Sequence, residues 1–309
     1  MKELVERVQQ EVRKAVVGRD DAVETMMAAV TLGGHVLVEG VPGTGKTLLA
    51  GAFARSLDLG FRRVQFTPDM LPSDLTGTMT LRGGELVFRP GPVFTNVLLA
   101  DEINRTPPRT QAALLEAMQE RQVSVEGRPS DLPEPFLVLA TQNPIEYEGT
   151  YPLPEAQLDR FLVKVDLGYP SEEVERSMLA LDRDGVGSND LSSIETVGNA
   201  QDIRAARDLV GATAVSDEVT AYAVALVRRT RELPSVSLGA SPRAAVHLLG
   251  AAKAAARTAG RDFVTPDDVA AMAPAVLAHR LILSPEAELE RFGVEQALRA
   301  AMAAVPIPR

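Results

Sequence analysis

Apolar residues in the first half of the chain alternate between two periods. Residues 3–16 carry apolar side chains at helical spacing, and a second helical stretch ends near Leu32, before Gly33-Gly34. Further helical stretches are predicted at 48–55 and 107–121. Short apolar runs, each typical of a strand, occupy 35–39, 93–100, 136–141 and 161–165, and residues 61–66 alternate like a strand. Strands that alternate with helices predict an α/β fold, a parallel sheet covered by helices on both faces.

Two stretches with hairpin patterns interrupt this alternation. Residues 76–94 place Gly83-Gly84 between two short apolar pieces, which predicts a hairpin inserted into the α/β core. Residues 122–135 predict a second, smaller hairpin with Glu126-Gly127-Arg128 near its turn. Both segments are therefore expected to be additions to a simple strand–helix alternation.

The pattern changes after about Pro170. Asp182 to Asn199, rich in Gly, Ser, Asn and Asp, predicts a surface loop or linker. We expect no strand beyond Pro170, and helical patterns cover 171–183, 201–210, 216–232, 241–259 and 266–281. We therefore divide the chain into an α/β core, residues 1–170, and a smaller all-helical domain, residues 171–309.

Composition narrows the classes of function. The chain has 309 residues, a formal net charge of −10 and no cysteine, and its three histidines are far apart in the sequence. Disulfides, thiolate sites and zinc are therefore not expected. The acidic balance lacks the broad basic footprint of nucleic-acid binding, so a nucleic-acid partner is not expected. No apolar run is long enough for a membrane span, and the N-terminus is a charged amphipathic helix, so we expect a cytoplasmic protein.

The strongest chemical signal is the segment Gly40-Val41-Pro42-Gly43-Thr44-Gly45-Lys46-Thr47. It lies between a predicted strand and a predicted helix, and it fits the G-x-x-x-x-G-K-[ST] phosphate loop, or Walker A motif. Glycines let backbone N–H groups approach phosphate oxygens, and the helix N-terminus adds its positive end. Lys46 is expected to reach the β- and γ-phosphates, and the Thr47 hydroxyl to bind Mg²⁺. With Leu48, this segment forms the predicted nucleotide-binding set.

A second nucleotide motif, of Walker B type, is predicted at residues 97–102, where an apolar strand ends in Asp101-Glu102. Ligands of open α/β sheets bind at this carboxyl edge. Asp101 is expected to hold Mg²⁺, directly or through water, and Glu102 to orient or deprotonate the attacking water. An apolar run ending in Asp-Glu is common by itself, but its place downstream of a phosphate loop favours this function.

Three further polar residues are candidates for the reaction. Asn143 follows a strand that should lie beside the strand of Asp101, so its amide could reach the γ-phosphate and the attacking water. An Asn before Pro is also a common turn former. Arg160 ends a short helix before a strand, and Arg243 lies in the first turn of a helix of the second domain. The residues alone do not distinguish these arginines from solvated ones, but a guanidinium at a phosphoryl transition state has large effects on rate.

Four segments together resemble the MoxR family of AAA+ ATPases. They are the phosphate loop, residues 101–120 (DEINRTPPRTQAALLEAMQE), residues 140–144 (ATQNP) and residues 153–161 (LPEAQLDRF). The second and fourth are the most specific to MoxR proteins and their close relatives. The resemblance covers residues 17–170 strongly and the helix of Arg243 moderately.

The resemblance implies an AAA+ P-loop core, a helical lid, and a ring, usually a hexamer, with ATP bound between subunits. It also implies that hydrolysis assembles or activates other protein complexes, often through a partner with a von Willebrand factor A domain. We expect a separate protein to receive this work. The insert at 76–94 and the hairpin at 122–135 would line the ring pore or contact a client.

The resemblance also assigns roles to single residues. Asn143 would be sensor 1 and Arg243 sensor 2, and Arg160 is the best match to the arginine finger that reaches the neighbour's nucleotide. Arg105 and Arg109 are further candidates for that interface. The adenine would be bordered by Val17 and Gly18.

Three other functions use the same phosphate loop. A DNA motor would need a basic pore hairpin or a DNA-binding tail, and the charges of the two predicted hairpins are mixed. A chelatase-type ATPase subunit also resembles MoxR proteins and is not separated by these motifs. A small-molecule kinase would need neither the Arg160–Arg243 pair nor a helical lid of this size. An oligomeric ATPase that remodels a protein is therefore the preferred hypothesis.

Overall fold

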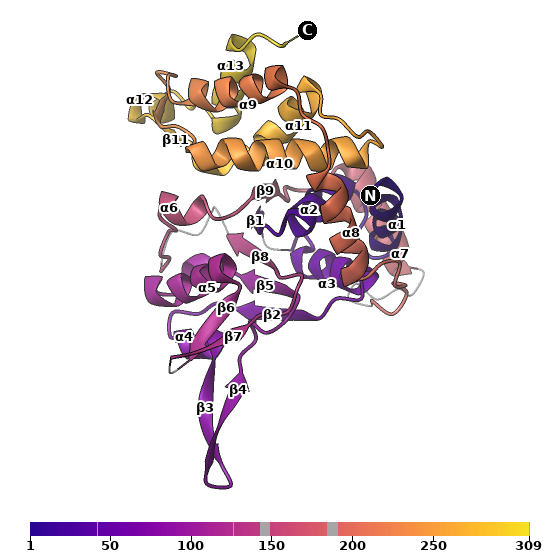
Figure 1. Ribbon diagram of the computed structural model, residues 1–309, viewed down its shortest axis with the longest axis vertical. Helices are drawn as coiled ribbons and strands as arrows, with labels where there is room; N and C mark the ends of the chain where they lie inside the picture. Colours follow the sequence, from indigo (N-terminus) through magenta and orange to yellow (C-terminus); the bar gives the residue numbers. More distant parts are fainter. Residues whose placement is uncertain (42, 126, 143–148, 184–190, 309) are drawn as a thin grey trace.

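The computed structural model describes residues 1–308 except 42, 126, 143–148 and 184–190. A five-stranded parallel sheet of order β2-β5-β8-β1-β9 lies at the centre of the N-terminal part (Figure 1). Its strands are β1 (Val36–Glu39), β2 (Phe61–Gln65), β5 (Val97–Asp101), β8 (Leu137–Gln142) and β9 (Val163–Asp166). The predicted α/β fold with a parallel sheet is confirmed.

Successive residues of the inner strands face two separate apolar cores. Val36 and Val38 of β1 pack into the larger core, whereas Leu37 between them packs into the smaller one. Helices α1 (Lys2–Arg13), α2 (Asp20–Leu32) and α3 (Lys46–Ser56) contribute to the larger core, and α5 (Pro108–Glu120) covers the other face (Figure 1). Burial on both faces explains why these strands are continuous apolar runs in the sequence.

A buried histidine holds the amino-terminal edge of the sheet. The ring of His35 accepts a hydrogen bond at Nδ1 from the backbone N–H of Val138 (3.0 Å) and donates from Nε2 to the carbonyl of Met118 (3.1 Å). It thereby connects the start of β1 with β8 and α5. Burial and, to a smaller extent, the charge of Arg121 lower the pKa of His35 from 6.5 to about 4, against the opposing effect of its hydrogen bond to Met118.

Stability is expected to fall as the pH drops below 6.5. The unfolded chain then binds a proton at His35 that the folded chain excludes until about pH 4, so acid favours unfolding. For His35 the loss is about 2 kcal/mol between neutral pH and about pH 5. Urea unfolding at both pH values measures it, and His35→Gln should lose about 2 kcal/mol less than the wild type over this interval. Equal losses in both proteins would contradict the assignment.

Both predicted hairpins are present. The first joins β3 (Gly77–Arg82) to β4 (Glu85–Pro90), and its two turn residues, Gly83 and Gly84, have φ of +58° and +90°. This hairpin projects from the core (Figure 1), with Leu81 and Leu86 largely exposed. The second joins β6 (Gln122–Val125) to β7 (Arg128–Asp131). A short helix, α4 (Pro72–Thr76), precedes the first hairpin.

Residues after Pro170 are mainly helical, as expected, but the expectation that no strand occurs there is wrong. A two-stranded ribbon pairs β10 (Val236–Leu238) with β11 (Ile282–Leu283). These strands are too short to carry a readable alternation. The helices of this part are α7 (Glu172–Arg183), α8 (Ala200–Gly211), α9 (Asp217–Thr230), α10 (Pro242–Thr258), α11 (Pro266–Leu277), α12 (Pro285–Leu289) and α13 (Val294–Ala304). No described helix has the length and apolar character of a membrane span.

Residues 191–199, within the segment predicted as a surface loop or linker, form an irregular and mostly exposed loop that is anchored to the α/β core. Ile194 is buried, and the backbone N–H of Glu195 donates to the Glu11 carboxylate of α1 (2.8 Å). The N–H of Val197 donates to the carbonyl of Ser56, the last residue of α3 (2.8 Å). The loop was therefore predicted, but its anchoring was not, because apolar residues at three-residue spacing are inconspicuous among the Gly, Ser and Asn of this segment.

Candidate functional site

The phosphate loop connects β1 to α3 at the carboxyl edge of the sheet. Gly43 and Gly45 have φ of +84° and +80°, and a Cβ added to either would point into open space. Gly40 is required for a different reason, because a Cβ there would lie 2.6 Å from the carbonyl oxygen of Leu167. The loop is therefore an open cradle next to the N-terminus of an eleven-residue helix. Pro42 lies outside the described residues.

Lys46 begins α3 and folds back over the loop. Its ammonium group donates to the carbonyls of Gly40 (2.7 Å) and Val41 (3.0 Å). Burial lowers the pKa of Lys46, and the negative charges of Asp101 and Glu102 oppose this shift. The cation thus lies in the field of both predicted Walker B carboxylates, as a phosphate-binding lysine requires. Thr47 follows it, exposed in the first turn of α3.

Asp101 ends β5 beside the loop, and both of its carboxylate oxygens accept hydrogen bonds. Oδ1 accepts from the hydroxyl of Thr141 (2.6 Å), and Oδ2 accepts from Nη2 (2.6 Å) and Nε (3.1 Å) of Arg63. The carboxylate is buried, whereas Arg63 is half exposed. A buried charge fixed by donors from both neighbouring strands is a well-oriented metal ligand.

Glu102 follows with left-handed backbone angles, φ 58° and ψ 52°. Its N–H donates to the same Thr141 hydroxyl (2.8 Å), so one side chain organises both acidic residues. The Glu102 carboxylate accepts from Nε2 of Gln65 (2.5 Å) and pairs with Nε of Arg105 (3.0 Å). A strained conformation held by such hydrogen bonds is typical of a functional position.

The residues fit a magnesium ion shared with a phosphate group. Within the described part of the chain, no cluster of three or more His, Cys, Asp or Glu side chains is arranged to hold a metal alone. Mg²⁺ in nucleotide sites commonly uses one or two protein oxygens and completes its shell with phosphate and water. Asp101 supplies a fixed carboxylate, and Thr47 supplies a hydroxyl at the start of α3.

A small hollow beside the loop is apolar. Val17 and Leu48 line it together with Gly43, Gly45 and Met178 of α7. The structure therefore brings the predicted adenine-bordering residue Val17 to the predicted loop. A Cβ on Gly18 (φ +73°) would lie 2.7 Å from Val174 of the same helix, so close packing of α7 requires glycine there.

Arg160 lies at the opposite edge of the sheet from its own phosphate loop. The N–H of Leu162 donates to the carbonyl of His35, and Val163 pairs with Val36, the first residue of β1. The loop follows the last residue of that strand, about 10 Å further along the sheet. The Arg160 guanidinium donates instead to the carbonyl of Leu115 on α5 (3.0 Å), in a surface groove between α5 and α6 (Glu155–Leu158).

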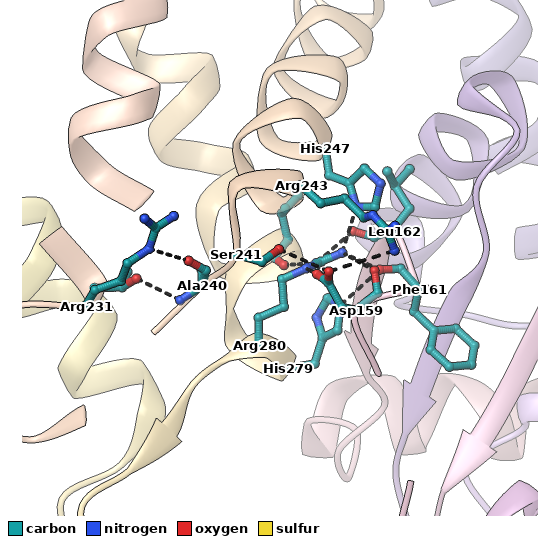
Figure 2. A network of polar contacts seen from close by, with 12 residues as sticks. Asp159, Phe161, Leu162, Arg231, Ala240, Ser241, Arg243, His247, His279 and Arg280 are labelled. Atoms are coloured by element: carbon teal, nitrogen blue, oxygen red, sulfur yellow. Dashed lines mark hydrogen bonds and ion pairs between the residues drawn. The ribbon is translucent and has the colours of Figure 1, made fainter. Parts of the chain in front are cut away.

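Arg243 lies on the same side as Arg160. It begins α10, is about half exposed, and its Nη1 is 4.0 Å from the carboxylate of Asp159 (Figure 2). The structure thus brings Arg243 to the residue before Arg160. Of the other arginines considered, Arg105 pairs with Glu102, and Arg109 is exposed at the start of α5. Asn143 lies outside the described residues.

Sequence reasoning missed Arg63, Gln65 and Thr141. All three lie at the carboxyl ends of the strands on either side of β5. Arg63 and Gln65 lie two positions apart at the end of β2, and this spacing indicates that both side chains lie on one side of the strand. Their partners could be identified only once the order β2-β5-β8 was known.

Two family models match the chain. The model for the ATPase family associated with various cellular activities (AAA) matches residues 35–163, which include strands β1, β2, β5 and β8 of the sheet and both the acidic and the phosphate-binding segments. The model for the AAA lid domain matches residues 228–301, which include α10 and α11.

Similar proteins cover the whole chain. Chaperone MoxR1 of Mycobacterium tuberculosis is 44% identical over 99% of this chain and 82% of its own length. Protein MoxR of Methylorubrum extorquens is 35% identical over 98% of this chain and 94% of its own length. A crystal structure from Cytophaga hutchinsonii, described as a candidate ATPase, is 40% identical, with a TM-score of 0.92 over 100% of this chain and 96% of that one.

Proposed function

The chain belongs to the MoxR family of AAA+ ATPases, and from this premise we propose that it hydrolyses Mg-ATP in a homo-oligomeric ring and thereby remodels a partner protein. The convergence of Lys46, Asp101 and Glu102 at one sheet edge supports this proposal most directly. The name of one relative, Chaperone MoxR1, supports the remodelling role.

Each side chain at this edge has a distinct role in the proposed reaction. The loop N–H groups and Lys46 bind the phosphates, and the apolar hollow at Val17 and Leu48 takes the base. Thr47 and Asp101 hold Mg²⁺, which when bound neutralises charge on the phosphate oxygens. Glu102 orients the attacking water and accepts its proton. Asn143, which follows β8 in the sequence, remains the proposed partner of the γ-phosphate.

The position of Arg160 supports a site shared between subunits. Its place at the far edge of the sheet separates it from its own phosphate loop, so a neighbouring copy is the proposed recipient. Arg243 faces the same side and is proposed to act on the neighbour's nucleotide as well. Subunits that each donate arginines to the next form a head-to-tail interface, which can close into a ring. A hexamer is the proposed size.

The client is proposed to be a protein, with a von Willebrand factor A domain as one candidate, contacted by the projecting β3–β4 hairpin. A helicase function is not favoured, since Arg82 and Glu85 lie opposite each other in the strand register at the tip of this hairpin, so the tip carries both signs of charge rather than a basic surface. The chelatase alternative gains no support from relatives named as chaperones. A cytoplasmic location stays a prediction.

Mixing two inactive variants tests the shared site. Arg160→Ala retains an intact phosphate loop, whereas Glu102→Gln retains an intact Arg160. Each should be inactive alone because one half of every site is damaged. In mixed rings an Arg160→Ala chain receives the arginine of a Glu102→Gln neighbour, so ATP hydrolysis should return. Steady-state phosphate release, with mass measurement of the mixed ring, measures the effect.

The matched control is Arg109→Ala, which replaces Arg160→Ala in the experiment. Arg109 is an exposed arginine on α5. This variant should hydrolyse ATP without a partner; an inactive Arg109→Ala protein would assign the interface role to Arg109 as well. Absence of rescue in mixed rings of the expected mass would contradict a trans role for Arg160.

A further inference from the structure

A buried guanidinium connects the lid to the segment that carries Arg160. Arg280 follows α11, and its side chain is only 2% exposed. Its Nε donates to Oδ1 of Asp159 at 2.7 Å (Figure 2). Asp159 immediately precedes Arg160, so the charge pair lies directly beside the proposed finger.

Arg280 also holds the backbone on the other side of Arg160. Its Nη2 donates to the carbonyl of Phe161 (2.6 Å), and its Nη1 donates to the carbonyl of Leu162 (3.3 Å). Nη1 also donates to the carbonyl of Val276, which lies in α11, the helix that precedes Arg280. Nη2 also donates to the carbonyl of Asp159 (3.3 Å), so one lid side chain engages four acceptors on the two sides of Arg160, the Asp159 carboxylate and three carbonyls.

A second lid element reaches the other oxygen of Asp159. The hydroxyl of Ser241 donates to Oδ2 (3.0 Å), and Arg243 approaches the same oxygen. Ser241 occupies the N-cap position of α10, yet its hydroxyl makes no capping bond to that helix. The Ser241 hydroxyl is therefore committed to Asp159 rather than to its own helix.

Two neutral histidines complete the surroundings of Arg280. Nδ1 of His247 accepts from Nη2 of Arg280 (2.7 Å), and His279 donates to the carbonyl of Phe161 (3.1 Å). Burial lowers the pKa of both histidines, and the Arg280 charge lowers them further. Among the described contacts of Arg280, Asp159 is the only negatively charged side chain. Arg280 therefore has no other carboxylate in these contacts with which it could form an ion pair.

Buried ion pairs contribute little net stability compared with apolar packing, but they fix geometry. A hydrogen-bonded cluster with every Arg280 nitrogen engaged specifies one placement of the lid against the start of β9 (Val163–Asp166). A buried ion pair at this position is therefore suited to fixing the lid relative to the α/β core rather than to adding stability.

We propose that Asp159 and Arg280 are positioning residues that hold Arg160 and Arg243 together on one lid-bound surface, so that the arginines completing a neighbour's site move with the lid. This inference rests on the proposed trans role of Arg160. If the arginines move with the lid, the rate of ATP hydrolysis depends on the lid of the subunit that donates the arginines. It does not depend in this way on the lid of the subunit that holds the ATP.

Mixed rings test this asymmetry. Asp159→Asn is placed either on the donor chain, together with Glu102→Gln, or on the acceptor chain, together with Arg160→Ala. On the donor chain it should lower the rescued hydrolysis rate about 10- to 100-fold, because the arginines are misplaced. On the acceptor chain, whose own arginine is already absent, the rescued rate should stay within about twofold of the parent mixture. A purely structural role would affect both arrangements equally.

Two further variants protect the test against misfolding. Ser241→Ala removes one neutral donor to the Asp159 carboxylate, and on the donor chain it should give the same asymmetry with a smaller loss. Asp268→Asn is the matched control, since Asp268 is a buried lid carboxylate paired with Arg261 (2.5 Å) without contact to Asp159. It should lower thermal stability without any difference between donor and acceptor chains.

The outcomes separate the two proposals. If the parent mixture shows no rescue, the trans role of Arg160 is wrong, and the positioning role fails with it. If the parent mixture is rescued but Asp159→Asn and Ser241→Ala act alike on donor and acceptor chains, the proposed function stands and the positioning role is overturned.

Discussion

Lys46→Ala is expected to weaken Mg-ATP binding at least about 100-fold, roughly 2.7 kcal/mol. The ammonium group is the cation that α3 contributes to the loop, and it lies in the field of Asp101 and Glu102. Its present acceptors are two loop carbonyls, at 2.7 and 3.0 Å, which phosphate oxygens can replace. Charge-assisted hydrogen bonds to phosphate are much stronger than those to neutral carbonyls, so the exchange favours binding. Titration calorimetry with Mg-ATP measures the difference.

Lys164→Ala provides a matched control for loop folding. Lys164 pairs with Glu39, the residue before the loop, at 2.5 Å. Its loss removes a cation next to the loop but none of the proposed phosphate contacts, so Mg-ATP affinity should change less than about threefold. Equal weakening by both variants would show that loop folding, rather than a phosphate contact of Lys46, accounts for the loss.

Local signals explain what the sequence could predict. Strand, glycine loop and helix follow one another within residues 35–56, so the phosphate loop needs no tertiary information. The Gly83-Gly84 turn likewise fixes its hairpin through the conformations of two residues. The buried strands could be identified from their apolar runs because both faces of each strand are covered by other parts of the protein.

Contacts between distant segments explain what could not be predicted. Thr141 reaches Asp101 only because β8 lies beside β5, and Arg280 reaches Asp159 across 121 positions of the chain. No periodicity of either segment encodes its partner. The adjacency of Arg160 and Arg243 likewise depends on where α10 packs, which required the structure.

Glu102→Gln is expected to bind Mg-ATP with nearly wild-type affinity and to lower hydrolysis about 10³-fold. The amide oxygen of glutamine can still accept from Gln65 and Arg105, so the contacts that hold Glu102 in place survive. Its N–H still donates to Thr141, which preserves the left-handed backbone. What is lost is a carboxylate able to take a proton from water, since an amide has no such basicity at neutral pH.

Single-turnover hydrolysis and nucleotide binding should be measured on the same Glu102→Gln preparation, because only their separation identifies a base. Thr141→Val offers the complementary change: it keeps the side-chain shape but removes the hydroxyl that orients both Asp101 and Glu102. If Glu102→Gln hydrolysed ATP at the wild-type rate while Thr141→Val did not, the hydroxyl network would matter through Asp101 and the metal alone. The proton of the attacking water would then have to leave through another acceptor at this sheet edge.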